Sequence, residues 1–380
     1  MTPILVTGSE GFLGRNLTIR LKALSRFQVA GVTVQTPEVD LLAALKRCDV
    51  IFHLACVNRP DDPAEFRIVN RDFTSAMCET LRALGRTPLI VFSSSIQAAL
   101  DNAYGVSKRE AEEVLSQFGD DTGAVIRIHR LSNVFGKWCR PNYNSVVATF
   151  CHNIANDLPI QISDPGRELE LVYVDDVVES FLAELPFCAE SGGNHEIPST
   201  RITLGDLAGR IQSFHDMRTN LLIPDFAVRF NQQLYATYLS YVPDEARRHQ
   251  LEIKSDHRGG LAEFIKSKNF GQIFISRTRP GITRGNHYHH TKTEKFLVVE
   301  GDGIVRMRHI ESPEVVEYQV RGEAFQVIDI PPGYTHSLEN IGAGDMVTLF
   351  WANQIFDPDR PDTYFLPVLA PAEIPAQVTA

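Results

Sequence analysis

The 380-residue sequence lacks any apolar run near the ~20 residues that a membrane-spanning helix needs. Its first residues lack the basic flank and small-residue cleavage site of a secretory signal, so the short apolar stretch there is expected to be a strand. Internal repeats and low-complexity segments are absent as well. These absences predict a cytoplasmic globular protein with no membrane partner.

The chain is also short of basic residues and of paired cysteines. Its 37 Lys and Arg against 47 Asp and Glu give a formal net charge of −10, which argues against nucleic acid as the main partner. Any anionic ligand must then be held by local Arg, Lys or helix N-termini. The 6 cysteines have no CxxC spacing, as expected of reduced thiols in the cytoplasm.

Two kinds of sequence pattern divide the chain. Up to about residue 190, apolar runs alternate with helical periodicity, which predicts an α/β, doubly wound parallel sheet of the Rossmann type. Beyond about residue 245, short strands alternate with Gly and Pro turns, which predicts an antiparallel barrel or jelly roll. We expect domains at residues 1–246 and 247–370 and a tail at 371–380. The expected strands lie at residues 4–7, 50–55, 89–93, 124–129, 271–277, 295–299, 303–308, 315–321, 325–330 and 346–351.

A glycine triplet follows the first expected strand. Gly8, Gly11 and Gly14 form Gly-x-x-Gly-x-x-Gly just before a helical stretch that begins at Phe12. Glycine lets the backbone turn tightly and approach a pyrophosphate, which sits on the free N–H groups of a helix N-terminus. The alternative is an ordinary strand–turn–helix with glycines for packing, but the position of the triplet favours a dinucleotide site.

The sequence also bears on which dinucleotide binds. An NAD site places a carboxylate at the end of the second strand for the ribose 2′-hydroxyl, and residues 28–36 contain none. Arg15 follows the third glycine and could meet a 2′-phosphate. The sequence therefore favours NADPH.

Tyr104 and Lys108 open a second predicted helix, and Ser94 and Ser95 end the strand before it. Residues four apart share a helix face, so the Lys108 ammonium can lie beside the Tyr104 ring and lower the pKa of its phenol. The phenol can give a proton to a ketone oxygen while hydride reaches the carbon, and a serine hydroxyl can hold that oxygen. The alternative is a surface helix with an incidental Tyr and Lys.

This combination resembles the extended short-chain dehydrogenase/reductases that act on nucleotide-linked sugars. Further matches are His53-Leu-Ala, Arg130-Leu-Ser-Asn-Val-Phe-Gly and Val172-Tyr-Val-Asp-Asp-Val. The resemblance implies that Tyr104 is the proton donor, Lys108 its modulator, and Ser95, or its rival Ser94, the oxygen anchor. It assigns cofactor contacts to Gly8, Glu10, Gly11, Phe12, Leu13, Gly14, Arg15, Asp40, Leu41, Leu54, Ala55 and Lys108, and substrate contacts to Asn133, Lys137 and Asn142. Asp40 is alternatively a helix N-cap.

A set of histidines and one carboxylate stands out in the second half. Two imidazoles one residue apart point to the same side of a strand, and three neutral nitrogens with one oxygen suit Zn, Fe, Ni or Mn(II). The pattern G-x5-H-x-H-x4-E-x6-G is met by Gly281, His287, His289, Glu294 and Gly301, and P-x-G-x2-H-x3-N by Pro331, Gly333, His336 and Asn340. One alternative is a set of exposed or capping histidines. Another is a metal that serves stability alone.

Both patterns resemble the signature of the cupin superfamily. Upstream, the stretch 256–264 looks like the nucleotide-contacting strand of cupin-type epimerases, with Arg258 on a diphosphate and Glu263 on a nucleobase or ribose. His290 and Lys292 stand beside the ligands, and each is either a catalytic acid/base group or a solvated loop residue. Tyr334 is a further candidate for the base.

From end to end the chain is similar to the bifunctional enzymes of capsule and O-antigen synthesis that fuse such a reductase to a cupin. Residues 134–145, 281–301 and 356–365 carry this resemblance. It implies a homodimer, with Zn²⁺ held by the four ligands named above, on the route from UDP-GlcNAc to UDP-N-acetyl-L-fucosamine. The cupin would epimerise C3 of a UDP-2-acetamido-2,6-dideoxy-hexos-4-ulose, a UDP-linked 4-keto-6-deoxy-HexNAc. The reductase would then reduce C4 with NADPH, giving UDP-2-acetamido-2,6-dideoxy-L-talose.

The two reactions are chemically consistent, because a C4 ketone acidifies the C3–H and is itself what the reductase removes. The alternatives are a single-function NADPH reductase with a structural zinc cupin for dimerisation, a cupin metal oxygenase fused to a reductase, and a nonenzymatic sugar-nucleotide sensor. The sequence leaves open the C3 base, the role of the metal and the choice of serine.

Overall fold

A computed structural model describes residues 1–185 and 196–369 of the chain. Cys188 and the expected tail at 371–380 lie outside the described residues. The chain forms two compact units, one of residues 1–212 with 232–243 and the other of residues 213–231 with 244–380. No helix within the described residues is long and apolar enough to cross a membrane.

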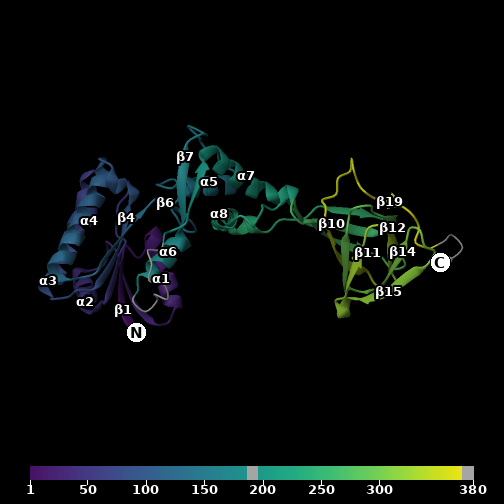
Figure 1. The fold of residues 1–380 in the computed structure, drawn as a ribbon, viewed down its shortest axis with the longest axis horizontal. Helices are drawn as coiled ribbons and strands as arrows, with labels where there is room; N and C mark the ends of the chain where they lie inside the picture. The colour runs from purple at the N-terminus through teal and green to yellow at the C-terminus, as the bar shows by residue number, and fades with distance from the viewer. Residues whose placement is uncertain (186–195, 370–380) are drawn as a thin grey trace. The chain divides into compact units, whose positions relative to one another are not determined.

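The first unit is built on a five-stranded parallel sheet with the strand order β2-β1-β3-β4-β5 (Figure 1). At its centre Thr7, the last residue of β1, pairs with Val32 of β2 and His53 of β3. The carboxyl ends of these strands therefore share one edge, where ligands of doubly wound folds bind. The strands are β1 (Thr2–Thr7), β2 (Phe27–Val32), β3 (Val50–His53), β4 (Leu89–Ser95) and β5 (Ile126–Leu131).

Helices cover both faces of this sheet, because successive strand residues point to opposite sides. Ile4 and Val6 pack with α1 (Phe12–Ala23) and α6 (Val174–Ala183). Leu5, between them in sequence, packs on the other face. That face is covered by α2 (Glu38–Arg47), α3 (Phe73–Ala83) and α4 (Ala103–Thr122).

Shorter elements complete the first unit and lead into the second. A three-stranded sheet, with the order β6-β7-β8, was not predicted, because strands as short as these carry little periodicity. It consists of β6 (Asn133–Phe135), β7 (Glu168–Tyr173) and β8 (Ser199–Thr203). The remaining helical segments are η1 (Phe66–Asp72), η2 (Ile96–Ala99), α5 (Val146–Ala155), α7 (Leu204–Asn220), α8 (Arg229–Leu239) and η3 (Asp244–Arg247).

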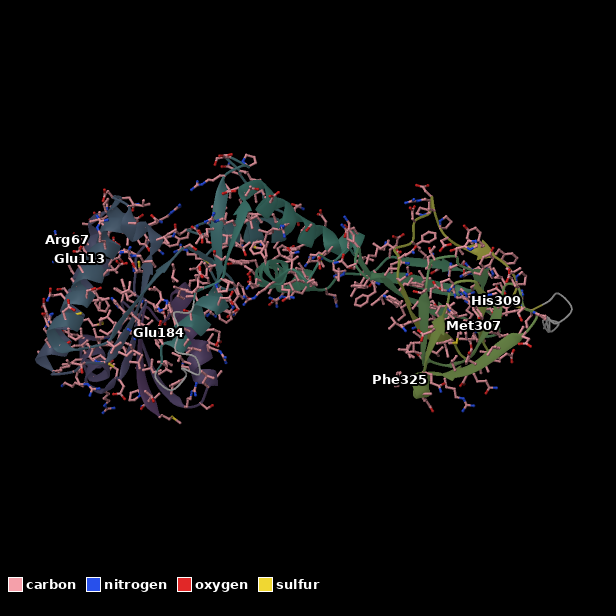
Figure 2. All side chains as sticks on the ribbon, in the orientation of Figure 1. Arg67, Glu113, Glu184, Met307, His309 and Phe325 are labelled. Atoms are coloured by element: carbon pink, nitrogen blue, oxygen red, sulfur yellow. The ribbon has the colours of Figure 1, made fainter. Side chains whose placement is uncertain are left out.

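Two antiparallel sheets form the second unit, with the orders β16-β13-β18-β11-β10-β9 and β15-β14-β17-β12-β19 (Figure 1). Their inward side chains make one core, to which Met307 of β14 contributes (Figure 2). The strands are β9 (Ile253–Asp256), β10 (Gly259–Ser267), β11 (Gly271–Thr278), β12 (Thr283–Tyr288), β13 (Glu294–Glu300), β14 (Asp302–His309), β15 (Val315–Arg321), β16 (Val327–Ile330), β17 (Tyr334–Asn340), β18 (Met346–Ala352) and β19 (Tyr364–Phe365), with a short helix η4 (Gly322–Ala324).

The parallel sheet between helices and the antiparallel barrel confirm the predicted fold class. Two predicted strands, at residues 124–129 and 325–330, begin two residues late, as β5 at Ile126 and β16 at Val327. Phe325 has a φ of 48°, a left-handed conformation that a strand does not accommodate, so β16 begins at Val327 (Figure 2).

Candidate functional site

The glycine triplet forms a tight turn between β1 and α1. Gly8 has a φ of 68° and its carbonyl accepts the Gly11 N–H at 2.9 Å. A Cβ on Gly14 would lie 2.0 Å from that carbonyl oxygen, so the turn and the first helical turn fit together only with glycine here. Phe12 begins α1, with Glu10 before it and Leu13 and Arg15 in its first turn. The predicted phosphate-binding contacts thus share one turn.

The turn after β3 lies against the glycine turn. A Cβ on Gly8 would come within 2.8 Å of the Ala55 nitrogen. The Thr7 hydroxyl accepts N–H bonds from Leu54 at 3.1 Å and from Ala55 at 3.2 Å. The structure therefore brings these two predicted cofactor contacts to the glycine turn at the switch point of the sheet.

His53 extends the hydrogen bonds of Thr7 into the core of the first unit. Its Nδ1 lies 2.8 Å from the Thr7 hydroxyl and its Nε2 lies 2.9 Å from the Thr74 hydroxyl, which donates to the Asn70 carbonyl. Burial, with a smaller effect of Lys108, lowers the pKa of His53 to about 3. The ring is therefore a neutral bridge between the strand ends and α3.

Two predicted cofactor contacts lie on α2. Asp40 is exposed in the first turn, and the N-cap of the helix is Pro37, so the alternative interpretation of Asp40 as an N-cap is wrong. Leu41 is partly buried and packs against the core of the first unit.

Arg15 lies beside the loop that follows β6. Its guanidinium carbon is 4.9 Å from the centre of the Trp138 ring, which adopts a left-handed backbone with a φ of 69°. The strand β2 ends at Val32, and residues 32–36 at its carboxyl end include no Asp or Glu.

Tyr104 and Lys108 lie in the first turns of α4, which is capped by Asn102 through a 2.8 Å bond from the Gly105 N–H. Lys108 is fully buried, and its ammonium donates to the Ser93 carbonyl at 2.7 Å. Burial raises the pKa of the Tyr104 phenol, contrary to the predicted lowering, because desolvation outweighs the hydrogen bond with Ser95 that favours the phenolate. The phenol is therefore protonated, the form that a proton donor needs.

The two candidate serines point to different partners. Ser94 donates a short hydrogen bond to the Glu112 carboxylate, which also accepts from Arg130 at 2.6 Å. Burial would raise the pKa of Glu112, but the bonds from Arg130 and Ser94 outweigh it and leave that pKa lowered. Ser95 is the serine that contacts the Tyr104 hydroxyl. The geometry thus favours Ser95 over Ser94 beside the reacting ketone.

Sequence reasoning missed two neighbours of this site. The Cys56 thiol lies 3.9 Å from the Tyr104 hydroxyl. Asn70, in the π-helix η1, holds the Val57 N–H at 2.9 Å and donates to the Ser107 hydroxyl at 3.0 Å. A π-helical turn is often found at functional sites, but nothing in the local sequence distinguishes it from an α-helix.

The predicted substrate contacts lie around the β6 loop. Asn133 is exposed on β6, and its amide donates to the Glu170 carbonyl at 3.1 Å. Lys137 forms an ion pair with Asp175. Asn142 has a φ of 53°, and its backbone N–H donates to the Thr149 hydroxyl at 3.0 Å.

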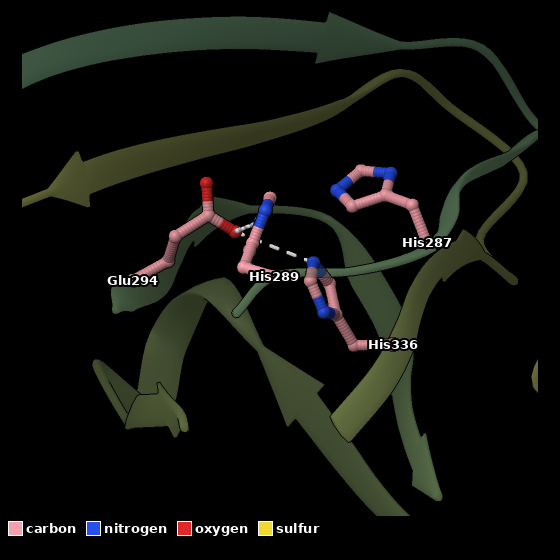
Figure 3. A group of neighbouring side chains, drawn as sticks. All are labelled: His287, His289, Glu294 and His336. Carbon is pink, nitrogen blue, oxygen red and sulfur yellow. Dashed lines mark ion pairs between the residues drawn. The ribbon is translucent and has the colours of Figure 1, made fainter. Parts of the chain in front are cut away.

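The four predicted metal ligands come together in the second unit (Figure 3). One donor atom from each of them lies within 4.8 Å of the others. His287 on β12 is paired directly with His336 on β17, next to a bulge at Asn286, which has a φ of 59°. Glu294 begins β13. His289 lies one residue beyond the end of β12, and not on the strand as predicted, because the backbone N–H groups that follow it bond to Asp362.

The chemistry of these four side chains fits a divalent cation. His289 Nδ1 lies 2.5 Å from the Asp362 carbonyl and His336 Nδ1 lies 3.2 Å from the Tyr334 carbonyl. A carbonyl oxygen only accepts, so each Nδ1 carries the proton and each Nε2 exposes a lone pair. Both Nε2 atoms are buried without a hydrogen bond, 3.3 Å from Glu294 Oε2.

Lone pairs and a carboxylate that face one another in a buried site repel unless a cation lies between them. A separation of about 3.3 Å is also that of neighbouring ligands around tetrahedral zinc with bonds of about 2.0 Å. Burial, with a smaller effect of His336, lowers the pKa of His287 to about 4, so this ring is neutral and able to bind a metal.

A cavity of about 470 Å³ opens onto these ligands. Its wall includes Arg258, Glu263 and Lys292, so both predicted nucleotide contacts and one acid/base candidate share it. His290 is exposed and lies outside the cavity wall, with its ring 4.8 Å from that of Tyr364. Tyr334 is outside the wall too, against His309.

Family models match both units. A model described as the NAD dependent epimerase/dehydratase family matches residues 4–197, which is about half of the chain. The chain belongs to the NAD dependent epimerase/dehydratase family. A second model, described as the polysaccharide biosynthesis C-terminal domain, matches residues 254–364.

Relatives match the chain almost end to end. It is 43% identical over 362 residues to the UDP-2-acetamido-2,6-beta-L-arabino-hexul-4-ose reductase of Pseudomonas aeruginosa, covering 95% of this chain and 97% of the relative. It is 42% identical to the capsular polysaccharide assembling protein CapF from Staphylococcus aureus, whose crystal structure matches with a TM-score of 0.90 over 97% of this chain and 100% of that one. The spore coat polysaccharide biosynthesis protein SpsL of Bacillus subtilis is 24% identical over 123 residues, or 30% of this chain and 82% of the relative.

These matches confirm the predicted resemblance to enzymes of capsule synthesis, to which CapF belongs. They also confirm the short-chain dehydrogenase/reductase half and, in its coarser form, the nicotinamide class of its cofactor.

Proposed function

We propose that this chain is a bifunctional UDP-sugar enzyme. Its barrel inverts C3 of a UDP-2-acetamido-2,6-dideoxy-hexos-4-ulose, and its parallel-sheet unit then reduces the C4 ketone with NADPH to UDP-2-acetamido-2,6-dideoxy-L-talose. The observation that carries the proposal is the presence of two complete sites on one chain, one with Tyr104 at a dinucleotide turn and one with a metal-ligand set in a ligand-sized cavity.

The reductase half is supported by the geometry around Tyr104. NADPH supplies the hydride to C4. The half-buried, protonated phenol gives its proton to the oxygen, Ser95 holds that oxygen, and the Lys108 ammonium stabilises the phenolate that remains. NADPH is preferred to NADH because the end of β2 carries no carboxylate for a ribose 2′-hydroxyl. The relative in Pseudomonas aeruginosa is named as a reductase of a UDP-linked 4-ulose.

The epimerase half is supported by the barrel cavity, whose volume lies within the roughly 300–1,000 Å³ of small-molecule sites. Arg258 and Arg284 put positive charge on its wall, as a diphosphate needs. Lys292 reaches the same cavity, and we assign it to proton transfer at C3 in preference to His290. A proton leaves C3 on one face, and another returns on the opposite face.

His287, His289, Glu294 and His336 would hold the metal, for which Zn²⁺ is the proposed ion. A cation there would supply the positive charge that stabilises a developing enolate oxygen. The residues of the chain orient the ketosugar against it, and the apolar wall, which includes Phe274, Phe296 and Phe350, keeps bulk water from the reacting carbon.

The product would enter the route to UDP-N-acetyl-L-fucosamine for a capsule or O-antigen, in keeping with the polysaccharide biosynthesis domain at residues 254–364. A homodimer in the cytoplasm, and the domain limits at residues 246 and 370, stay predictions. The second candidate function is a single-function NADPH reductase whose cupin is a structural zinc module. It is favoured by the fact that the relative in Pseudomonas aeruginosa is named for reduction alone.

Product analysis tests the proposal. The UDP-linked 4-keto-6-deoxy-HexNAc is incubated with the enzyme and NADPH, and the product is assigned by proton NMR. The proposal predicts a sugar inverted at C3 and reduced at C4. A product that is reduced at C4 but keeps its C3 configuration would establish the single-function reductase instead.

A further inference from the structure

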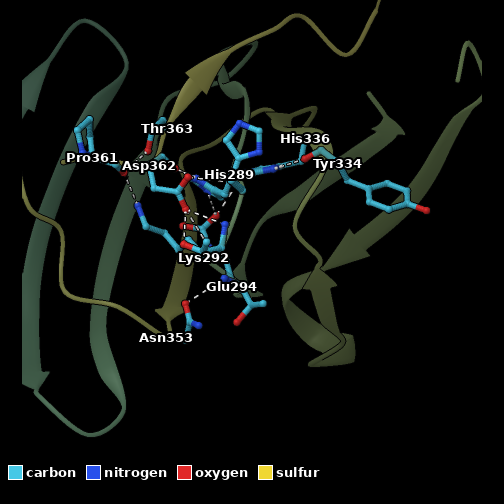
Figure 4. Close-up of polar contacts among 12 residues, drawn as sticks. His289, Lys292, Glu294, Tyr334, His336, Asn353, Pro361, Asp362 and Thr363 are labelled. Carbon is cyan, nitrogen blue, oxygen red and sulfur yellow. Dashed lines mark hydrogen bonds and ion pairs between the residues drawn. The ribbon is translucent and has the colours of Figure 1, made fainter. Parts of the chain in front are cut away.

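The segment at residues 356–365 contacts the loop that joins β12 to β13 through Pro361 and Asp362 (Figure 4). Asp362 of this segment is partly buried, and its carboxylate accepts the backbone N–H groups of His290 and Thr291, both at 2.9 Å, and of Lys292 at 3.0 Å. The Thr291 hydroxyl adds a fourth bond at 2.9 Å. One carboxylate therefore holds three successive residues of the loop that connects two metal ligands.

The backbone carbonyls of the same segment bind side chains of that loop. The Asp362 carbonyl accepts from His289 Nδ1 at 2.5 Å, and the Pro361 carbonyl accepts from the Lys292 ammonium at 2.9 Å. The first bond fixes the tautomer of His289 and turns its Nε2 toward Glu294. The second holds the acid/base candidate at the cavity wall.

The backbone of Asp362 fits this double contact. Its φ of 42° lies in the left-handed region, which Asp tolerates better than most residues do. The loop from His289 to Thr293 lies outside the strands. Its two ends bond to Gly333 and Asn353, and between them the Asp362 carboxylate accepts the backbone N–H groups of residues 290–292.

We propose that Asp362 is a positioning residue of the metal centre: it sets the orientation of His289 and the path of the loop that leads to Glu294. The inference rests on the proposed metal site and deepens it. Groups that orient metal-bound histidines typically change metal affinity about 10- to 100-fold when they are removed. If the hydrogen bonds of Asp362 served folding alone, their removal would leave the metal affinity of the folded protein unchanged.

The test uses the full chain and Zn²⁺ as the probe. Asp362→Asn removes the charge and half of the carboxylate acceptor atoms, and Asp362→Gly removes the side chain while allowing the left-handed φ. Both variants keep the backbone carbonyl that meets His289 Nδ1, so they test whether the carboxylate, by fixing the loop, holds that contact in place. Asp359→Asn is the matched control, because Asp359 is an exposed aspartate of the same segment. Competition with a chromophoric chelator should show Zn²⁺ affinity about 10- to 100-fold weaker in both Asp362 variants and within about twofold of wild type in the control.

The visible absorption of the Co²⁺-loaded protein gives a second readout, since it reports ligand geometry directly. We expect an altered spectrum in Asp362→Asn and an unchanged one in Asp359→Asn. Wild-type affinity together with a wild-type Co²⁺ spectrum in Asp362→Asn would overturn the inference.

Unfolding of the metal-free proteins separates positioning from folding. Positioning predicts that metal-free Asp362→Asn keeps a folded barrel but binds Zn²⁺ more weakly. If the barrel is unfolded in both variants without metal, and Zn²⁺ restores it with the wild-type Co²⁺ spectrum, Asp362 serves folding and the inference fails. If the wild-type chain itself binds no Zn²⁺, the proposed metal site fails, which is a distinguishable result.

Discussion

Tyr104 is half-buried and His53 is fully buried, and desolvation moves the pKa of each in the direction that keeps it neutral. Neutrality serves each of them differently. The phenol needs its proton to deliver it to a ketone. The imidazole needs one nitrogen with a proton and one without, because it bridges the hydroxyls of Thr7 and Thr74.

Tyr104→Phe removes the proton donor and leaves the fold intact, since the ring stays. We expect kcat for C4 reduction to fall by about 100- to 10,000-fold. Deuterium exchange at C3 should be unchanged, because it belongs to the other unit. The rate of C4 reduction is measured by the stopped-flow loss of NADPH absorbance. Wild-type turnover in the variant would show that Tyr104 is not the proton donor.

His53 predicts a pH dependence of stability. Its folded pKa of about 3 lies below its ordinary value of 6.5, so on acidification the unfolded chain takes up the proton first. Stability is therefore lost as the pH falls from 6.5 toward 3, with a slope of up to about 1.4 kcal/mol per pH unit from this group.

Urea unfolding at pH 7 and pH 5 measures this pH dependence of stability. The unfolding is monitored by the fluorescence of Trp138 in a Trp351→Phe background, because Trp138 is then the one tryptophan left of the 2 and reports on the first unit. His53→Asn in the same background should show a shallower slope. Equal slopes in the two proteins would contradict the assigned pKa.

At the scale of elements, the end of β4 and the start of α4 build the reductase site. Ser94 and Ser95 are neighbours at the carboxyl end of β4, and they meet different residues of α4. One side chain meets Glu112 in the core and the other meets Tyr104. We therefore expect Ser94 to contribute mainly to stability and Ser95 mainly to the reaction.

A pair of alanine variants tests this division. Ser95→Ala should lower kcat for reduction by about 100-fold, the loss typical of one oxyanion donor. It should also cost about 1 kcal/mol of unfolding free energy, because the Ser95 hydroxyl caps η2. Ser94→Ala should lose about 1–3 kcal/mol of unfolding free energy, because Glu112 loses a buried donor, and should keep its kcat. The reverse pattern in paired kinetics and unfolding would exchange the roles of the two serines.

Much of the element pattern could be predicted from sequence. The strand at residues 315–321 was predicted to the residue, because alternation and turn residues are local signals. The contacts of Asp362 and Asn70 could not be predicted, since their partners lie 70–73 and 13–37 residues away. Long-range hydrogen bonds leave no periodic trace in a sequence.

For the whole molecule, two separate compact units carry two sites, and this predicts that the activities can be lost independently. Removing the metal with dipicolinate should abolish exchange at C3 and lower the unfolding temperature of the barrel. Reduction of a ketosugar supplied already inverted at C3 should stay within about twofold of the untreated rate. Loss of both activities on chelation would show that the reductase depends on the metal as well.

The central claim is that the barrel is an epimerase. Proton NMR of the UDP-linked 4-keto-6-deoxy-HexNAc in D2O, with zinc-loaded enzyme and without NADPH, tests it most directly. An epimerase in the barrel predicts that deuterium appears at C3 and that this exchange is lost in His336→Ala. No exchange at C3, in a zinc-loaded sample that still reduces a ketosugar when NADPH is added, would contradict the account and leave a single-function reductase with a structural barrel.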